Sequence, residues 1–394
     1  MNKQKHYLLF CPGPVNVASN IWQTMAQTIG HREAEFSELL NSINDKLLQI
    51  YEVKNTKKYF PVVITGSGTA ANESVLSSLG NKRILIITNG EFGERLVAIS
   101  KLHNKHTHKI SFGWGEEIVI AKVEEYLKKH AIDVIAMVHH ETSTGMLNPV
   151  AKIGKLAKQY KKQFFVDTVS SAVAEKVDLE NWHITFCSTS SGKAISALPG
   201  LGMIIGERKA FEQLPQQPDR VMYLNLAKLY QYAVSSQQTP NTPAVHLFYA
   251  LDQSLTNILS VGLPQWRKIL QERAFFLRQE MQKLDLHFLI DEQIMSSVLT
   301  TVILPDHISA EDLKQRLRDK RIIIYSGKGP LLGKVFQVGN IGELTKHDLL
   351  YFMNALKQVL AFTSTRAYNM PKSLSFDLGS MLSVPHARER VKRS

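Results

Sequence analysis

The sequence predicts an α/β protein with a large, mostly parallel sheet and a smaller α+β domain at its C-terminal end. From about residue 60, apolar strand-like runs alternate with helical segments, as expected for parallel strands joined by covering helices. Past about residue 245 a long helical stretch precedes shorter strands and helices. Polar segments containing glycine follow several expected strands. Ligands gather at the carboxyl ends of strands in such sheets.

The expected elements follow one another along the chain. In the first region we expect strands at 7–10, 60–65, 83–88, 106–111, 134–139, 164–167, 184–187 and 202–205, and helices at 70–79, from about 92, and at 150–163. In the second region we expect a helical stretch over 243–283, strands at 298–304, 322–325 and 335–338, and helices at 310–318 and 344–362. The predicted organisation is an N-terminal arm (1–20), a large domain (21–245), a small domain (246–363) and a flexible basic tail (364–394).

Composition narrows the class of protein. The chain has 394 residues, of which 44% are hydrophobic and 21% charged, as in ordinary globular proteins. Its two cysteines, Cys11 and Cys187, offer neither a disulfide framework nor metal-ligand spacing. The start of the chain lacks the apolar core of a signal peptide, and no run of about 18 apolar residues exists. We therefore expect a cytoplasmic protein with no membrane partner.

The net charge of +12 raises the question of nucleic-acid binding. The lysines are spread along helical segments such as 150–163, where a solvated face explains them. No motif places aromatic residues among basic ones. We therefore predict no nucleic-acid partner.

Lys193 and Asp167 are the first candidate catalytic residues. Lys193 follows Ser190-Ser191-Gly192 after one expected strand, and Asp167 closes another. Pyridoxal 5'-phosphate (PLP) chemistry needs such a pair, since an amine binds the cofactor aldehyde and a carboxylate keeps the pyridine nitrogen protonated. Taken alone the pair is weak, because loop lysines are usually solvated and aspartates at strand ends usually form turns or caps.

The segment Ser67-Gly68-Thr69 is a candidate phosphate site. It follows an expected strand and opens an expected helix, whose N-terminus offers free N–H groups and partial positive charge. It lacks the third glycine of a dinucleotide-binding fingerprint and the Gly-Lys-Ser/Thr of a Walker A loop. An NAD-dependent oxidoreductase is therefore disfavoured, and a plain strand–helix turn stays open.

Two further strand ends carry candidate residues. Phe92, between Gly90 and Gly93, could stack on a flat ring, although such a residue is more often part of the core. His139, His140 and Glu141 suggest a metal site, but successive strand residues point to opposite faces. We predict no metal.

Together these residues resemble the class V aminotransferases of PLP fold type I, and within them the 2-aminoethylphosphonate–pyruvate aminotransferases. The motifs that carry the resemblance lie at 12–15, 66–69, 89–95, 140–149, 166–171, 191–200 and 338–343. Seven modest motifs in family order are specific when taken together. The resemblance implies a PLP-dependent transfer of an amino group from 2-aminoethylphosphonate, or a similar small amine or amino acid, to a 2-oxo acid such as pyruvate.

The resemblance also implies residue roles. Lys193 would bind the cofactor and carry the proton, Asp167 would pair with the pyridine nitrogen, and Phe92 would stack on the ring. The other implied cofactor contacts are Ser67, Gly68, Thr69 and Ser190 at the phosphate, Thr142 beside the ring hydroxyl, and Thr242 at the phosphate of the partner subunit's cofactor. The role of Thr242 implies a homodimer.

Three positions depart from the family pattern. Gln337 stands where the family has an arginine that grips the substrate carboxylate, and a neutral amide cannot replace that charged fork. Arg32 is a candidate replacement, with a structural role equally open. Gly192 and Thr185 stand where relatives often carry Asn and Asp; Gly192 could loosen the lysine loop, and the Thr185 position is taken as structural. A PLP-dependent lyase and a non-catalytic protein of the same fold remain alternatives.

Overall fold

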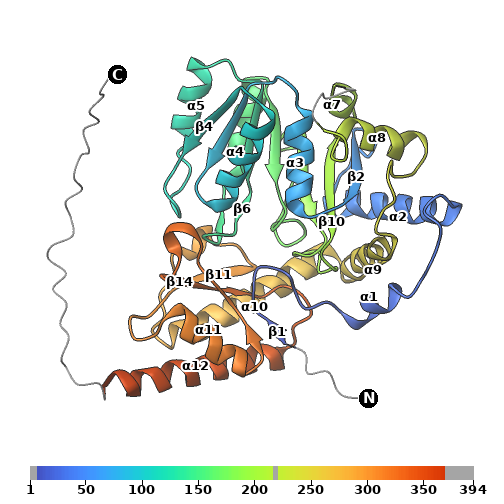
Figure 1. The fold of residues 1–394 in the computed structure, drawn as a ribbon. Coiled ribbons are helices and arrows are strands. Elements are labelled where there is room, and N and C mark those ends of the chain that lie inside the picture. The colour runs from blue at the N-terminus through green and yellow to red at the C-terminus, as the bar shows by residue number, and fades with distance from the viewer. Residues whose placement is uncertain (1–6, 216–220, 369–394) are drawn as a thin grey trace, which may run out of the picture.

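The protein is built around a seven-stranded sheet, shown for a computed structural model that describes residues 7–215 and 221–368 (Figure 1). The strand order is β2-β10-β9-β8-β5-β3-β4, and every strand runs parallel to the others except β10. The strands are β2 (Tyr59–Thr65), β3 (Ile84–Thr88), β4 (Thr107–Ser111), β5 (Val134–Val138), β8 (Gln163–Asp167), β9 (Phe186–Ser190) and β10 (Leu201–Glu207). The predicted mostly parallel sheet is confirmed.

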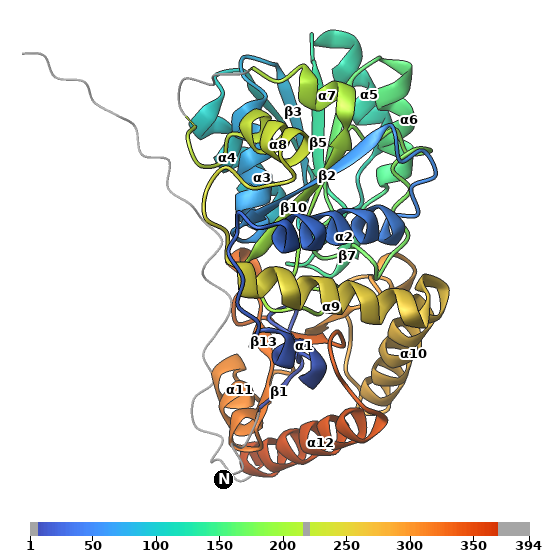
Figure 2. The ribbon, with the colours of Figure 1, turned by 90° about the vertical axis from the view of Figure 1, so that its right-hand side faces the viewer.

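Helices cover both faces of this sheet (Figures 1 and 2). Alternate strand residues point to opposite faces, so Leu85 and Ile87 of β3 join one core cluster while Ile84 and Ile86 join the other. The first cluster includes α2 (Ala34–Ile50), α5 (Ile120–Lys129), α6 (Val150–Gln159) and α9 (Val245–Val261). The second includes α3 (Gly68–Ser78), α4 (Glu91–His103), α7 (Arg208–Glu212) and α8 (Leu226–Ser235).

A smaller α+β unit lies below the large sheet in Figure 1. Its antiparallel sheet has the order β11-β14-β13, and α10 (Leu263–Gln282), α11 (Ala310–Asp319) and α12 (Lys346–Tyr368) contribute to a core with it. The strands are β11 (Leu299–Ile303), β13 (Tyr325–Ser326) and β14 (Val335–Gly339). Near the start of the chain, β1 (Leu8–Leu9) pairs in parallel with β12 (Ile322–Ile323), so the N-terminal segment is tied to this unit.

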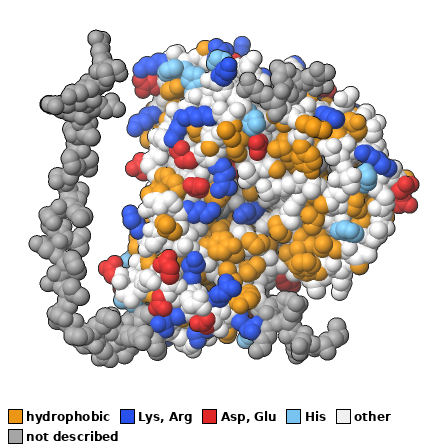
Figure 3. All heavy atoms as spheres, viewed as in Figure 1, with side chains coloured by type: hydrophobic (Ala, Val, Ile, Leu, Met, Phe, Trp, Pro, Cys, Tyr) orange, Lys and Arg blue, Asp and Glu red, His pale blue; other side chains and the backbone are white. Residues whose placement is uncertain are grey.

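Some shorter elements complete the fold. They are α1 (Ser19–Thr24), the two-stranded β6 (His140–Glu141) and β7 (Met146–Leu147), and the 3₁₀ turns η1 (Glu292–Ile294) and η2 (Gly329–Leu331). Within the described residues, no helix is both long enough and apolar enough to cross a bilayer. On the face in Figure 3, basic side chains are interspersed with acidic and neutral ones, and apolar side chains are most frequent on the right-hand half.

Several predicted boundaries were wrong. The stretch 243–283 is two helices, because Gly262 adopts a left-handed φ of +85° and ends α9. The helix expected over 150–163 ends at Gln159, and the chain turns at Lys161 (φ +53°) to enter β8. The expected strand 322–325 is divided between β12 and β13, which pair with different partners.

Two further boundaries differ from the predictions. Strand β9 runs to Ser190, three residues beyond its predicted end. Helix α12 continues to Tyr368, so the first residues of the predicted tail are helical; the rest, 369–394, lies outside the described residues.

Candidate active site

A cavity of about 290 Å³ lies at the carboxyl ends of β2, β3, β5, β8 and β9. The predicted site residues other than Thr242, Arg32 and Gln337 all line it. The complete lining is Gly13, Pro14, Ser67, Gly68, Thr69, Asn72, Phe92, Arg95, Val138, His140, Thr142, Asp167, Val169, Ser170, Ser190, Gly192, Lys193, Pro199 and Gly200. The fold therefore brings together residues that are more than a hundred positions apart in the sequence.

Lys193 lies against the N-terminal segment of the chain. Its Nζ donates a hydrogen bond to the carbonyl of Pro12 at 3.1 Å. A Cβ added at Gly13, whose φ is +138°, would lie 2.7 Å from both Nζ and Cδ of the lysine, so only glycine permits this approach. Burial lowers the pKa of Lys193, which increases the neutral fraction of the amine that can attack an aldehyde or take up a proton.

Asp167 is buried at the end of β8 and is held on both sides. Its Oδ1 accepts the backbone N–H of Val169 at 2.8 Å, and its Oδ2 accepts Asn72 Nδ2 at 2.6 Å. Asn72 lies on α3 and in turn accepts a hydrogen bond from the Ser188 hydroxyl. Burial raises the pKa of Asp167, and the two hydrogen bonds oppose that rise. A cationic ring nitrogen beside this carboxylate would compensate for its lost hydration.

The N-terminus of α3 forms another wall of the cavity. Ser67 is the N-cap residue in an extended conformation, and no side chain caps the helix there. The first N–H groups of a helix have no partner within it, and they favour an anion such as phosphate. A Cβ at Gly68 would lie 2.7 Å from a methyl group of Val169, so the helix start and the segment after β8 are in close contact.

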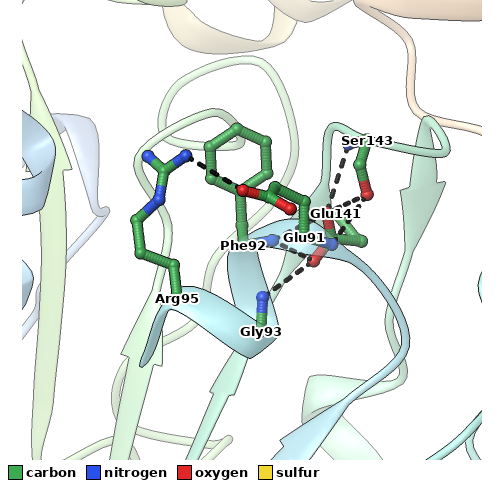
Figure 4. A network of polar contacts seen from close by, with 6 residues as sticks. All are labelled: Glu91, Phe92, Gly93, Arg95, Glu141 and Ser143. Atoms are coloured by element: carbon green, nitrogen blue, oxygen red, sulfur yellow. Dashed lines mark hydrogen bonds and ion pairs between the residues drawn. The ribbon is translucent and has the colours of Figure 1, made fainter. Parts of the chain in front are cut away.

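Phe92 lies at the start of α4, where the buried carboxylate of Glu141 holds its backbone (Figure 4). The Glu141 side chain accepts hydrogen bonds from the backbone N–H groups of Phe92 (3.1 Å) and Gly93 (3.0 Å), and from the Ser143 hydroxyl. Burial raises the pKa of Glu141, which these donors oppose. Glu141 thus fixes the helix start that carries the Phe92 ring, in the manner of an acceptor at a helix N-terminus.

The adjacent histidines face different surroundings, as their alternation on a strand predicts. His139 contacts the Ser171 hydroxyl at 3.0 Å and the edge of Trp182, while His140 lines the cavity and bonds the Ser170 carbonyl through Nδ1. Burial lowers the pKa of His139 to about 3 and that of His140 to about 4. In the described part of the chain, no three His, Cys, Asp or Glu side chains are grouped to hold a metal ion.

Two departures from the family pattern have a structural explanation. A Cβ at position 192 would lie 2.8 Å from Cα of Pro199, so Gly192 allows the lysine loop to pack against that proline. This contact contradicts the idea that Gly192 loosens the loop. The Thr185 hydroxyl accepts the backbone N–H of Phe164 at 3.0 Å. Thr185 therefore joins two neighbouring strands, in agreement with the structural role expected for it.

Three predicted residues lie outside the cavity lining. Gln337 is buried, and its Nε2 donates to the carbonyls of Thr142 (2.6 Å) and Ser143 (3.3 Å) and to the Thr301 hydroxyl (3.2 Å). Arg32 is exposed and donates to the Thr239 carbonyl at 2.8 Å. Thr242 is exposed on the loop before α9. The roles given to Arg32 and Thr242 remain predictions.

Several residues that line the cavity have no role among the predictions from the sequence. Asn72 orients Asp167, and Arg95 lies 4.6 Å from the centroid of the Phe92 ring. His140 contributes a buried Nε2 that has no hydrogen-bond partner among the described residues. Arg95 stands inside a matched motif, which is a signal that could have been used, whereas nothing in the helix pattern distinguishes Asn72.

Comparison with known proteins decides the family. A family model described as aminotransferase class-V matches residues 18–341. The chain belongs to the class V aminotransferases. An uncharacterised aminotransferase of Methanocaldococcus jannaschii is 33% identical over 87% of this chain and 90% of its own length. A 2-aminoethylphosphonate–pyruvate transaminase of Bacillus cytotoxicus is 30% identical over 90% of this chain and 98% of its own length.

Solved structures of aminotransferases share the fold. Alanine–glyoxylate aminotransferase of Nostoc is 28% identical, with a TM-score of 0.85, and the match covers 91% of this chain and 96% of that one. Ureidoglycine–glyoxylate aminotransferase of Bacillus subtilis is 25% identical, also with a TM-score of 0.85, over 92% and 94% of the two chains. The predicted PLP fold type I is confirmed.

The cofactor of this aminotransferase is PLP, and the cavity has the groups that PLP requires. The buried amine of Lys193 suits its aldehyde, the Asp167 carboxylate suits a protonated pyridine nitrogen, and the uncapped α3 N-terminus suits a phosphate. The unpartnered Nε2 of His140 adds a polar atom to the same wall. When bound, PLP supplies an aldehyde that receives the amino group and a ring that stabilises negative charge.

Proposed function

We propose that this aminotransferase moves an amino group from 2-aminoethylphosphonate, or a similar small amine or amino acid, to a 2-oxo acid such as pyruvate. The observation that carries the proposal is the near full-length similarity to 2-aminoethylphosphonate–pyruvate transaminases, at about 30% identity. The replacement of the expected arginine by Gln337 supports a donor whose anionic group is not bound at that position.

We assign the chemistry to two side chains. Lys193 Nζ would hold the cofactor by its aldehyde, and as a neutral amine it would accept a proton from the donor carbon and give it back later in the reaction. Its lowered pKa supports this role, because a neutral amine is needed for both tasks. Asp167 keeps its charge beside the pyridine nitrogen, and Asn72 keeps the carboxylate in place. Phe92 orients the ring, and the arm residues Pro12 and Gly13 shield the lysine from water.

The test is a visible absorbance scan of the purified holoenzyme. We expect the band of the lysine-bound cofactor to disappear on addition of 2-aminoethylphosphonate and to return with pyruvate. Lys193→Ala should lack the band, while Lys268→Ala, at a side chain that is 65% exposed, should keep it. A band that is unchanged by 2-aminoethylphosphonate but is lost with another amino donor would overturn the proposed substrate, while transamination would remain supported.

We also propose that the enzyme acts as a homodimer. Thr242 is exposed and lies outside the cavity of its own chain, which supports a role in the partner's site. The exposed apolar side chains Trp22, Met222 and Val234 offer apolar surface that a second subunit could cover. Light scattering of the eluted holoenzyme tests this proposal, and a fully active monomer would overturn it.

We further propose a cytoplasmic location. Cys11 and Cys187 are free and buried, which suits a reducing compartment. Fractionation of cells that express the tagged protein, followed by immunoblotting, tests this, and recovery outside the cytoplasmic fraction would refute it.

A further inference from the structure

Two cations converge on the ring of Phe92. The guanidinium carbon of Arg95 lies 4.6 Å from the ring centroid, and Nζ of Lys328 lies 5.3 Å from it. Arg95 belongs to α4 and lines the cavity, whereas Lys328 comes from the loop between β13 and η2 of the smaller unit. The two parts of the molecule therefore each place one positive charge at the same side chain of the active site.

Neither cation has a short contact with a carboxylate among the described residues. Arg95 contacts a carboxylate only loosely, at 3.6 Å from Glu91 (Figure 4). Lys328 is exposed and forms no ion pair with a described residue. Arg278 of the smaller unit, whose charge contributes to the lowered pKa of His140, already has hydrogen-bond partners. It donates to the Thr300 hydroxyl at 3.0 Å and to the backbone carbonyl of Ser296.

The loop that carries Lys328 is held in place on both sides. The N–H of Gly327 donates to the Val335 carbonyl at 3.0 Å, and the N–H of Leu331 donates to the Lys328 carbonyl at 2.9 Å. A Cβ at Gly329, whose φ is +50°, would lie 2.8 Å from the Trp114 ring, so the loop rests directly on the large domain. This contact holds the loop against the large domain, where Nζ of Lys328 lies over the Phe92 ring.

Both cations also act on the catalytic lysine. Burial is the main cause of the lowered pKa of Lys193, and the charges of Lys328 and Arg95 add to it. A negative group bound between these cations would thus lie close to the amine that performs the chemistry. This location suits the end of a short donor whose amino group is at Lys193.

We propose that Arg95 and Lys328 together bind the anionic group of the amino donor, in place of the arginine that Gln337 replaces. The inference rests on the proposed function for the donor, and it specifies a small amine that ends in a phosphonate or carboxylate. The Arg95 guanidinium can offer a fork of two N–H donors to such a group, and the Lys328 ammonium adds a second positive charge. Gln337 instead anchors the Thr142–Ser143 backbone.

Binding of an unreactive anion tests the site directly. The holoenzyme is titrated with ethylphosphonate, and separately with propionate, and Kd is measured by calorimetry. We expect Lys328→Ala to raise the Kd of ethylphosphonate by about 10- to 100-fold, as for loss of one charge-assisted contact. Lys334→Ala removes an exposed lysine on the other side of η2, next to β14, and should leave Kd unchanged. A stronger effect on ethylphosphonate than on propionate would identify a phosphonate donor, and the reverse a carboxylate donor.

Single-turnover rates separate this inference from the proposed donor. Lys328→Ala should slow loss of the visible band with 2-aminoethylphosphonate and leave the rate unchanged with propylamine, which has no anionic group. Lys328→Arg should restore the first rate. If the phosphonate donor reacts normally in Lys328→Ala and ethylphosphonate binds as before, the site is refuted while the proposed function stands. If 2-aminoethylphosphonate is no donor but ethylphosphonate still needs Lys328, the site stands and the donor is another anionic amine.

Gln337→Arg gives an independent test. If Arg95 and Lys328 already bind the anion, the added arginine should change the Kd of ethylphosphonate by less than about threefold in the wild-type background. A large gain there would show that the anion is bound at position 337 instead, and would overturn the assignment.

Discussion

The seven-stranded sheet and the smaller C-terminal unit contribute to the active site in different ways. The strand ends of the large sheet carry Lys193, Asp167 and the α3 N-terminus, each fixed by short hydrogen bonds or close packing. The smaller unit contributes Gln337, which anchors backbone, and Lys328, which is exposed. The part that holds a cofactor common to the whole family is buried and preorganised, whereas the part that meets the variable substrate is more open.

The largest effect should come from Asp167→Asn. We expect kcat/KM to fall by roughly 10²- to 10⁴-fold, since removing one charge of a buried pair costs about 3–5 kcal/mol. Because Asp167 serves the cofactor, kcat/KM should fall by the same factor for donors with and without an anionic group. Steady-state kinetics with both donors checks this, and Asp319→Asn at the end of α11 is the control. A loss confined to donors with an anionic group would contradict the proposal that the large sheet serves the cofactor and the smaller unit serves the substrate.

A smaller effect is expected for Glu141→Gln. The amide would bring its own N–H donors toward the N–H groups of Phe92 and Gly93, so the start of α4 should loosen. We expect the free energy of unfolding in urea to drop by about 1–3 kcal/mol and the Kd for PLP to rise, with the ratio of rates between donors unchanged. Glu272→Gln, at a side chain that is 63% exposed, is the control. Wild-type stability in Glu141→Gln would show that Phe92 is positioned by other contacts.

The last effect is of similar size but is confined to acid pH, and it concerns His139. His139 has a pKa of about 3 in the folded protein against about 6.5 when unfolded. As pH falls below 6.5 the unfolded chain takes up a proton that the folded chain does not, so stability falls. Between pH 7 and 4.5 the wild type should lose about 2–3 kcal/mol more than His139→Gln. Urea unfolding at both pH values measures this difference, and His287→Gln, at a 76% exposed side chain, serves as control. Parallel pH curves for wild type and His139→Gln would mean that His139 is solvated.

Sequence patterns predicted the fold class and the cofactor residues because both depend on local signals. Lys193, Asp167 and Ser67–Thr69 each follow a recognisable apolar strand, and strand ends of a parallel sheet meet at one edge. Helix α2 was overlooked although Phe36, Leu39, Leu40 and Ile43 have helical spacing. The break at Gly262 was missed because glycine occurs in helices as well as at their ends.

The remaining site residues depend on long-range packing and leave no local signal. Asn72 looks like any polar residue on a helix, yet its partner Asp167 is 95 positions away. Lys328 looks like a loop lysine, and its position over Phe92 follows only from the docking of its loop on Trp114. The role of Gln337 likewise follows from which backbone carbonyls lie beside it.

The pairing of β1 with β12 has a consequence for biosynthesis. The arm that covers Lys193 leaves the ribosome before the strands of the large sheet, but its strand partner, Ile322–Ile323, is synthesised after all of them. The strands of the large sheet can pair before that, so the nascent chain passes through a stage in which the lysine is uncovered. The active site is therefore completed only once β12 has been synthesised, and chains that terminate before β12 should leave this lysine open to stray aldehydes.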